Sequence, residues 1–219
     1  MNNNPNATLN SDASYYQRVR TWPNAFKLKR EAKILDIGCG SGQLGQYFQN
    51  ELQCAVTGVE ITEHNYAIAK EVLSNTLLGD IESLDLNLIE TDFDYIIFSD
   101  SLEHMLNPDK VLTKVRQLIA KNGELLISIP NVRNFRVTVP LVFKGDWKYQ
   151  DEGLLDRTHL RFFTIASISR LLYECGYKVE EVLLDLPTSS KVGVLNMLTF
   201  GLFRNHLTSH YFIRARKCE

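Results

Sequence analysis

The sequence predicts an α/β fold in which a doubly wound, mostly parallel sheet carries helices on both faces. From Lys33 onward, short apolar segments alternate with amphipathic ones, which is typical of parallel strands joined by helical crossovers. Residues 93–99 carry a continuous apolar core, as expected for a strand covered on both faces. The first predicted strand contains Asp36 and runs into three alternating glycines, which let a ligand approach the backbone closely.

The expected elements follow one another along the chain. Strands are predicted over residues 33–37, 54–60, 74–79, 93–99, 124–129, 178–185 and 209–216. Helices are predicted over residues 43–50, 63–73, 107–122 and 164–176, with a short helix or loop at 81–90. Thr62 is the expected N-cap of the second helix, Asn107 and Pro108 are expected to open the third, and Asn122 with Gly123 is expected to end it.

Two long irregular stretches, residues 130–163 and 186–208, interrupt this rhythm. Loops of this length in a compact domain are usually functional or disordered. Because both stretches contain aromatic and aliphatic residues, we expect them to form a lid. Residues 1–12 are rich in Asn and Ser and predict a flexible tail, which leaves one domain over residues 13–219.

The composition limits the classes of partner and compartment. The chain has 219 residues and a net charge of −2, and it shows no basic face, so no nucleic-acid partner is predicted. Four scattered cysteines favour a reducing compartment over a disulfide framework. No signal peptide is evident, and the longest apolar run, residues 192–203, is too short to cross a membrane. These features predict a cytoplasmic location and no transmembrane segment.

The glycine segment supports a more specific identification. The string LDIGCGSG at residues 35–42 resembles the first motif of class I S-adenosyl-L-methionine (SAM) methyltransferases. This resemblance implies a Rossmann-like, seven-stranded sheet with an antiparallel last strand, and SAM as the cofactor. Gly40, Gly42 and Gly45 also match the dinucleotide fingerprint literally, which leaves NAD-dependent oxidoreduction as an alternative. Asp36 disfavours that alternative, because dinucleotide enzymes usually carry an apolar residue there.

The resemblance also implies a set of cofactor-binding residues. Asp36 would face the charged methionine end of SAM, and Glu60, roughly 20 residues past the glycine loop, would bind the ribose hydroxyls. Asp80 would contact the adenine amino group, and Ile81 would pack on the ring. Ser99 and Asp100 end the fourth predicted strand, where the family closes over the sulfonium. The implied cofactor set is therefore Asp36, Gly38, Gly40, Gly42, Glu60, Asp80, Ile81 and Ser99. A tyrosine of a leading helix, Tyr15 or Tyr16, would either cover the cofactor or pack on the core.

Two histidines are candidate catalytic bases. Methyl transfer requires an aligned acceptor and, for a hydroxyl, removal of its proton, which suits histidine at neutral pH. His104 lies in a stretch, LEH, that resembles small-molecule methyltransferases of the ubiquinone O-methyltransferase group. His159 lies in LDRTHLRFFT, which resembles bacterial methyltransferases of sugar and surface-polysaccharide pathways, with a weaker likeness to methionine-biosynthesis methyltransferase-like proteins. Alternatively, His104 contacts the cofactor or orders its loop, and the charged residues around His159 only pair with one another: Asp156, Arg157 and Arg161.

The acceptor is the least determined part of the prediction. Arginines in the first insert are compatible with an anionic acceptor, and Trp147 and Tyr149 would either stack on a sugar or pack within the lid. The apolar run 192–203 would suit a lipid-linked acceptor or a dimer contact, so monomer and homodimer both remain open. No metal is predicted, because Asp92, Asp94 and Asp100 do not form a clustered set. The motif for base or amide methylation, N/D-P-P-Y/F, is absent after the fourth strand.

Two functional hypotheses follow. The leading one is SAM-dependent methyl transfer to a small-molecule acceptor, at the oxygen of a sugar or a lipid-linked intermediate. The alternative is a SAM-binding partner subunit that has no turnover of its own.

Overall fold

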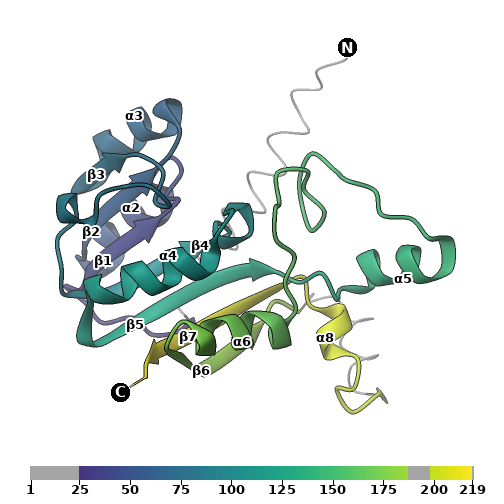
Figure 1. The fold of residues 1–219 in the computed structure, drawn as a ribbon. Helices are drawn as coiled ribbons and strands as arrows, with labels where there is room; N and C mark the ends of the chain where they lie inside the picture. The colour runs from purple at the N-terminus through teal and green to yellow at the C-terminus, as the bar shows by residue number, and fades with distance from the viewer. Residues whose placement is uncertain (1–24, 187–197, 219) are drawn as a thin grey trace.

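The computed structural model describes residues 25–186 and 198–218. The tail predicted at residues 1–12, the tyrosines at 15 and 16, and half of the apolar run 192–203 lie outside these ranges. Seven strands form one sheet (Figure 1): β1 (Lys33–Ile37), β2 (Ala55–Glu60), β3 (Asn75–Leu78), β4 (Phe93–Ser99), β5 (Ile119–Pro130), β6 (Tyr177–Leu184) and β7 (His210–Lys217).

The strand order is β3-β2-β1-β4-β5-β7-β6. The pairs from β3 to β5 are parallel, whereas β7 runs antiparallel to both β5 and β6. The predicted Rossmann-like, mostly parallel sheet with an antiparallel last strand is confirmed. The described helices are α2 (Gln43–Leu52), α3 (Glu63–Val72), α4 (Pro108–Val115), α5 (Phe135–Lys144), α6 (Ile165–Glu174) and α8 (Arg204–Leu207), with 3₁₀ turns η1 (Leu86–Leu88), η2 (Leu102–His104) and η3 (Arg116–Leu118).

Helices cover both faces of the sheet, which makes it doubly wound as predicted (Figure 1). On one face, α4 and α6 contribute fully buried side chains such as Leu112 and Leu172 to a cluster with Phe98 of β4. On the other face, α2 and α3 pack against β1 and β2 through Phe48 and Ala69. Burial of these stripes is the main favourable term for the fold, because each fully buried large aliphatic side chain contributes roughly 1.5–3 kcal/mol.

One predicted helix boundary is wrong. Helix α4 ends at Val115 and passes through η3 into β5 at Ile119, so Asn122 and Gly123 lie inside the strand instead of ending a helix. At this point the β4–β5 register shifts, and a Cβ on Gly123 would lie 2.6 Å from the carbonyl oxygen of Phe93. The glycine is therefore explained by close approach of two backbones at a strand irregularity.

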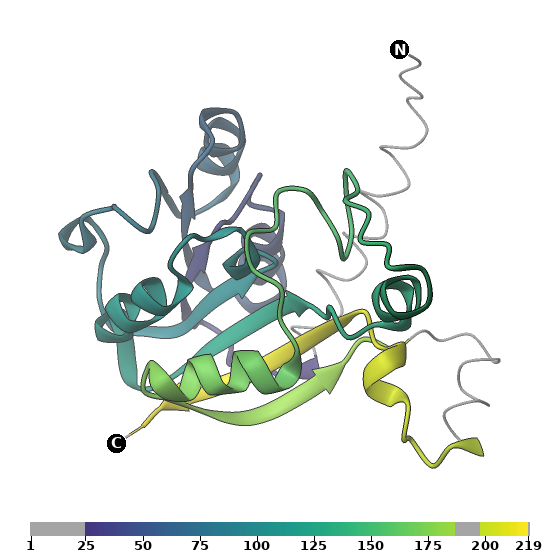
Figure 2. The ribbon, with the colours of Figure 1, turned by 45° about the vertical axis from the view of Figure 1, so that its right-hand side comes forward.

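The two inserts that interrupt the sheet lie at one edge of it. The first insert follows the end of β5 and contains α5, and the second contains α8; both helices lie on the same side of the molecule in two views (Figures 1 and 2). Hydrogen bonds join the inserts, since the side chain of Asn134 donates to the carbonyl oxygens of Leu207 at 3.4 Å and Thr208 at 2.8 Å. None of the helices in the described ranges has the length and apolar character that a bilayer span requires.

Candidate active site

The carboxyl ends of β1, β2 and β4 meet at one edge of the sheet, where open α/β sheets bind their ligands. The glycine loop after β1 is tied to β2, because the backbone N–H groups of Gly38 and Cys39 donate to the carbonyl of Val59 at 2.8 and 3.2 Å. A Cβ on Gly38 would lie 2.7 Å from the Cβ of Ser101, so this glycine makes room for the segment that follows β4. No atom of the described residues lies within 4 Å of the Cβ position of Gly40 beyond its chain neighbours, so a ligand can approach its backbone.

Glu60 closes this loop from the end of β2. Its carboxylate accepts hydrogen bonds from the backbone N–H of Gly40 at 2.9 Å, from that of Thr62 at 2.9 Å and from the Thr62 hydroxyl at 2.7 Å. Thr62 therefore occupies the N-cap position of α3, as predicted, but its hydroxyl makes no cap bond and holds the carboxylate instead. A buried acid held in this way has remaining lone pairs at the edge where a diol would bind.

Asp36 is buried in β1, and its Oδ1 has no hydrogen-bond partner within the described part of the chain. Burial, and then the charge of Glu60, raise the pKa of Asp36 from 3.8 to about 7. A buried, unpaired carboxyl costs free energy when it is ionised, unless a cation comes beside it. Together with the open backbone at Gly40, this carboxyl fits the cationic methionine end of SAM.

The remaining residues of the predicted cofactor set lie at the ends of neighbouring strands. Asp80 follows β3, and its carboxylate accepts from the backbone N–H of Glu82 at 2.9 Å. Ile81 is largely packed into the core, and Ser99 ends β4 with a buried hydroxyl that lacks a partner among the described residues. Gly42, the last glycine of the predicted cofactor set, has a packing role. A Cβ at Gly42 would lie 2.9 Å from the side chain of Val72, so the lack of a Cβ permits α2 to pack on α3.

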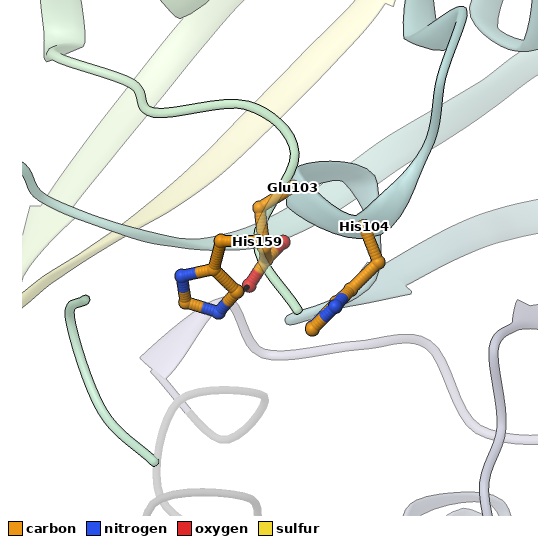
Figure 3. Close-up of side chains that lie close together, drawn as sticks. All are labelled: Glu103, His104 and His159. Atoms are coloured by element: carbon orange, nitrogen blue, oxygen red, sulfur yellow. Dashed lines mark ion pairs between the residues drawn. The ribbon is translucent and has the colours of Figure 1, made fainter. Parts of the chain in front are cut away.

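A second cluster lies on η2, just beyond β4, where Glu103, His104 and His159 come together (Figure 3). The carbonyl oxygen of Glu103 accepts the backbone N–H groups of Leu160 at 2.8 Å and Arg161 at 2.9 Å. These two bonds fix the loop that carries His159 against η2. Two histidines that are distant in sequence are thereby brought to a ring-centroid separation of 4.8 Å, with an edge-on arrangement.

Hydrogen bonding indicates which atom of His104 is able to take a proton. Its Nδ1 lies 3.2 Å from the carbonyl oxygen of Thr158, and a carbonyl can only accept, so Nδ1 carries the hydrogen. The Nε2 atom of His104 is then an acceptor, on an exposed side chain. His159 is instead buried, and its Nε2 lies 3.9 Å from a carboxylate oxygen of Glu103.

The pKa values of the buried pair Glu103 and His159 are shifted in opposite directions. Burial, and then the charge of Asp100, raise the pKa of Glu103 well above its ordinary value. Burial, and then His104, lower the pKa of His159 below 6.5. Burial thus favours the neutral form of each group, and a neutral imidazole at His159 is able to accept a proton.

The same three side chains form a candidate metal-ligand set. One ligand atom from each of Glu103, His104 and His159 lies within 4.8 Å of the others. Two imidazoles and one carboxylate are a ligand combination used by transition metals. The prediction that the protein uses no metal therefore remains a prediction. The LEH stretch contains Glu103, but no sequence signal predicts a role for this residue.

Three aromatic side chains lie beside His159, and we call them the aromatic wall: Trp147, Tyr149 and Phe162. Phe162 lies 6.1 Å from the ring centroid of His159, 5.1 Å from that of Trp147 and 6.4 Å from that of Tyr149. The charged residues nearby do not pair with one another in the described contacts, contrary to the alternative interpretation. Arg157 pairs with Asp151 at 2.6 Å, and Arg161 donates to the carbonyl of Leu106.

A cavity of about 390 Å³ opens between the two inserts. It is lined by the start of α5, residues 153–155 and His210 of β7. The Nε2 atom of His210 lies 3.8 Å from the carboxylate of Asp100, which precedes η2. The cavity therefore lies next to the edge of the sheet that carries the predicted cofactor-binding residues.

Comparisons with known proteins agree with this geometry. A family model described as a methyltransferase domain matches residues 13–182. A ubiquinone biosynthesis O-methyltransferase of Pseudomonas aeruginosa is 26% identical over 187 residues, covering 82% of this chain and 71% of that protein. The bifunctional methionine biosynthesis protein MetXA/MetW of Rhodopirellula baltica is 27% identical over 183 residues, and the match covers 74% of this chain but only 27% of that protein.

The fold is shared with solved structures at low sequence identity. A SAM-dependent methyltransferase from Archaeoglobus fulgidus superimposes with a TM-score of 0.68 at 19% identity, covering 92% of each chain. Similarity at this level of identity establishes the architecture, whereas the family model addresses the sequence itself.

Proposed function

The chain belongs to the methyltransferase domain family, and from this premise we propose that it transfers the methyl group of SAM to an oxygen atom of a small-molecule acceptor. SAM is the cofactor, and S-adenosyl-L-homocysteine is the product. The observation that carries the proposal is the position of His104 and His159, which meet just beyond β4, at the edge of the sheet where Asp36 and Glu60 lie at or near the ends of their strands.

Four acidic or apolar side chains would hold the cofactor. The carboxylate of Asp36 would balance the positive methionine end, and Glu60 would accept hydrogen bonds from the ribose hydroxyls. Asp80 and Ile81 would contact the adenine. The bound cofactor supplies a methyl group on positively charged sulfur, so the protein's own task is to align the acceptor and take its proton.

One of the two imidazoles would take the proton of the acceptor hydroxyl. His159 is buried and neutral at pH 7, and His104 offers its Nε2 because Nδ1 is engaged by Thr158. The shielding of His159 from water favours it as the base, with His104 orienting the acceptor. Glu103 is in place to stabilise the imidazolium that forms, since its oxygens have no other described partner.

The acceptor is proposed to be a sugar or a lipid-linked intermediate. The aromatic wall of Trp147, Tyr149 and Phe162 suits the face of a ring, and the cavity of about 390 Å³ would accommodate one. The P. aeruginosa relative is named for ubiquinone biosynthesis, which supports oxygen as the atom methylated and a lipid-linked phenol as one class to test.

Calorimetry with SAM and S-adenosyl-L-homocysteine tests the cofactor half of the proposal. The protein is expected to bind both, and Glu60→Gln to weaken binding by roughly 100-fold, since it removes a charge-assisted acceptor. Glu63→Gln, an exposed change at the start of α3, serves as the matched control and should bind normally. Absence of binding by the unmodified chain would overturn the proposal.

A transfer assay with methyl-labelled SAM tests the acceptor half. The acceptor panel comprises nucleotide sugars, a polyprenyl-linked sugar and a prenylated phenol. His159→Asn should abolish transfer to any acceptor that works, whereas His64→Asn, on the exposed surface of α3, should not change it. Cofactor binding without transfer, with activity appearing only when a cell extract fraction is added, would instead favour the partner-subunit alternative.

A further inference from the structure

The part of the chain least explained by the site is a pair of exposed apolar segments. Helix α5 has ten residues, of which only Val137 is buried, whereas Val142 is 73% exposed and Phe143 80% exposed. The second segment, at residues 198–203, carries Phe200 at 100% exposure and Leu202 at 76%. We call these two segments the apolar apron. Large apolar side chains grouped on a surface in this way mark an interaction site.

One segment of the apron, α5, lines the cavity between the inserts. Phe135 and Val137 of α5 line that cavity together with Leu207, the last residue of α8, and α8 directly follows the second segment. Arg133, just before α5, donates from Nε to His206 Nε2 of α8 at 3.3 Å, so the residues that flank the two segments are in contact. Figure 2 shows α5 and α8 at the same side of the molecule, beyond the end of β5.

The two stretches of chain that contain the apron carry a net positive charge, whereas the whole chain carries a net negative one. Residues 131–148 and 198–209 together carry one acidic side chain, Asp146, and five basic ones: Arg133, Arg136, Lys144, Lys148 and Arg204. The complete chain has a net charge of −2. A short helix with apolar residues exposed and basic residues at its margins is typical of segments that lie in a membrane interface. Basic side chains at such a surface are attracted to anionic lipids.

We propose that the apolar apron docks on the surface of an anionic phospholipid bilayer. The exposed side chains of α5 and of residues 198–203 would enter the headgroup layer, and the five basic side chains would face the lipid phosphates. Docking in this orientation presents the cavity mouth to molecules held in the bilayer surface. This last step rests on the proposed function, because it supplies a lipid-linked acceptor to the site, whereas the docking itself does not depend on methyl transfer.

A second copy of the chain is the less favourable occupant. A two-fold contact through the apron would bring the same patch of both copies together and place five basic side chains opposite five others. Like charges at an interface oppose association, and an anionic bilayer removes that cost.

Vesicle flotation with the complete chain tests the proposal. The vesicles are phosphatidylcholine alone and a three-to-one mixture of phosphatidylcholine with phosphatidylglycerol, roughly 25% anionic lipid. The chain is expected to float with the anionic vesicles, to bind phosphatidylcholine weakly and to lose binding as salt is raised. Val142→Asp combined with Phe143→Asp should weaken binding roughly tenfold or more, because two apolar side chains leave the interface.

A matched control is available at the other edge of the sheet. Tyr173 is 75% exposed near the end of α6, which leads into the start of β6, and Leu88 is 60% exposed in η1. Tyr173→Asp combined with Leu88→Asp should float as well as the unmodified chain. Equal loss in both double variants, or no flotation of the unmodified chain, would overturn the proposal.

Light scattering and calorimetry separate the remaining outcomes. A dimer in solution that Val142→Asp with Phe143→Asp dissociates would assign the apron to a second copy and reject the bilayer. Retention of SAM binding by that variant shows that it is folded. If SAM fails to bind any form while flotation persists, the proposed function fails and the docking surface stands.

Discussion

The Nε2 atom of His159 lies 3.9 Å from the nearest carboxylate oxygen of Glu103, and the two side chains are 6% and 2% exposed. This separation is too long for a hydrogen bond, but a shift of about 1 Å would form one. Neither oxygen of Glu103 has another hydrogen-bond partner in the described ranges. The imidazole of His159 is therefore the polar group best placed to respond to a change in the charge of Glu103. Likewise, Glu103 is the group best placed to respond when His159 gains a proton.

Removing the carboxyl group of Glu103 should change the pKa of His159. In the free protein the pKa of His159 lies below its ordinary value because burial disfavours the imidazolium. As His159 gains a proton, Glu103 can ionise and stabilise it, so Glu103→Gln should lower the pKa of His159 further. Imidazole NMR between about pH 4.5 and 8 measures this, with exposed His64 as an internal control. An unchanged or raised pKa of His159 would show that the two groups act independently.

Methyl transfer should not depend on a metal at Glu103, His104 and His159. The neutral imidazole of His159 can accept a proton without a Lewis acid, so we expect full turnover after exhaustive chelation. Elemental analysis of the purified protein gives a second readout. Stoichiometric zinc, iron or manganese that disappears in His159→Asn would contradict the prediction and make these side chains metal ligands.

The strands, and the edge of the sheet that carries the predicted cofactor-binding residues, were predictable because the sequence patterns that specify them are local. Residues 33–37 and 93–99 appear as strands at the predicted bounds, and parallel pairing then brings Asp36 and Glu60 to one edge. The spacing of about 20 residues between the glycine loop and Glu60 also needs only the length of one βαβ unit. The contact between the loop and Glu60 follows from that unit.

Contacts made by long inserts were not predictable in the same way. Helix α4, strand β5 and helix α5 lie between Glu103 and His159 in the sequence. The loop that carries His159 is held by two backbone hydrogen bonds to the Glu103 carbonyl, and no sequence pattern encodes these bonds. The predicted end of α4 was wrong because Asn122 followed by Gly123 resembles the C-terminal end of a helix. Gly123 is instead explained by packing, because a Cβ there would clash with the carbonyl oxygen of Phe93. The apron was predicted only in part. The apolar run 192–203 was expected to suit a lipid-linked acceptor or a dimer contact, whereas α5 lies in a stretch that was predicted to be irregular.

Substitutions at Gly38 and Ser101 should have strongly non-additive effects on the free energy of unfolding. A methyl group on Gly38 would lie 2.7 Å from the Cβ of Ser101, and φ at this position is +76°, so Gly38→Ala should destabilise the protein by roughly 2–3 kcal/mol. Ser101→Gly alone loses a hydrogen bond of 2.8 Å to the Ile37 carbonyl. The double variant should recover part of the loss, because the clash is gone and only the backbone strain remains. Denaturant unfolding of all four proteins measures the coupling, and strict additivity would contradict it.

The pH dependence of SAM binding should report on Asp36. Its pKa of about 7 in the free protein means that the carboxyl is mostly protonated below pH 7, whereas a cationic ligand binds the ionised form. Binding must then release a proton, so affinity should fall by about tenfold for each pH unit below 7 and level off above it. Calorimetry from about pH 5.5 to 7.5 in buffers of different ionisation enthalpy measures both effects. Asp36→Asn should bind weakly at every pH and without proton release; a sloping profile in this variant would assign the proton to another group.

The same carboxyl should make the free protein less stable as pH rises. In the unfolded chain Asp36 ionises near 3.8, whereas in the fold it keeps its proton to about pH 7, so its favourable contribution is complete below pH 3.8 and is lost between these values. Asp36→Asn mimics the protonated form and should raise the Tm by roughly 5 °C at pH 8, with little change near pH 4.5. Saturating SAM should reverse the order at pH 8, because the ligand compensates the buried charge only in the unmodified protein. If Asp36→Asn lowers the Tm at pH 8 without SAM, then the ionised carboxyl is already balanced in the free fold and Asp36 is not waiting for a cation.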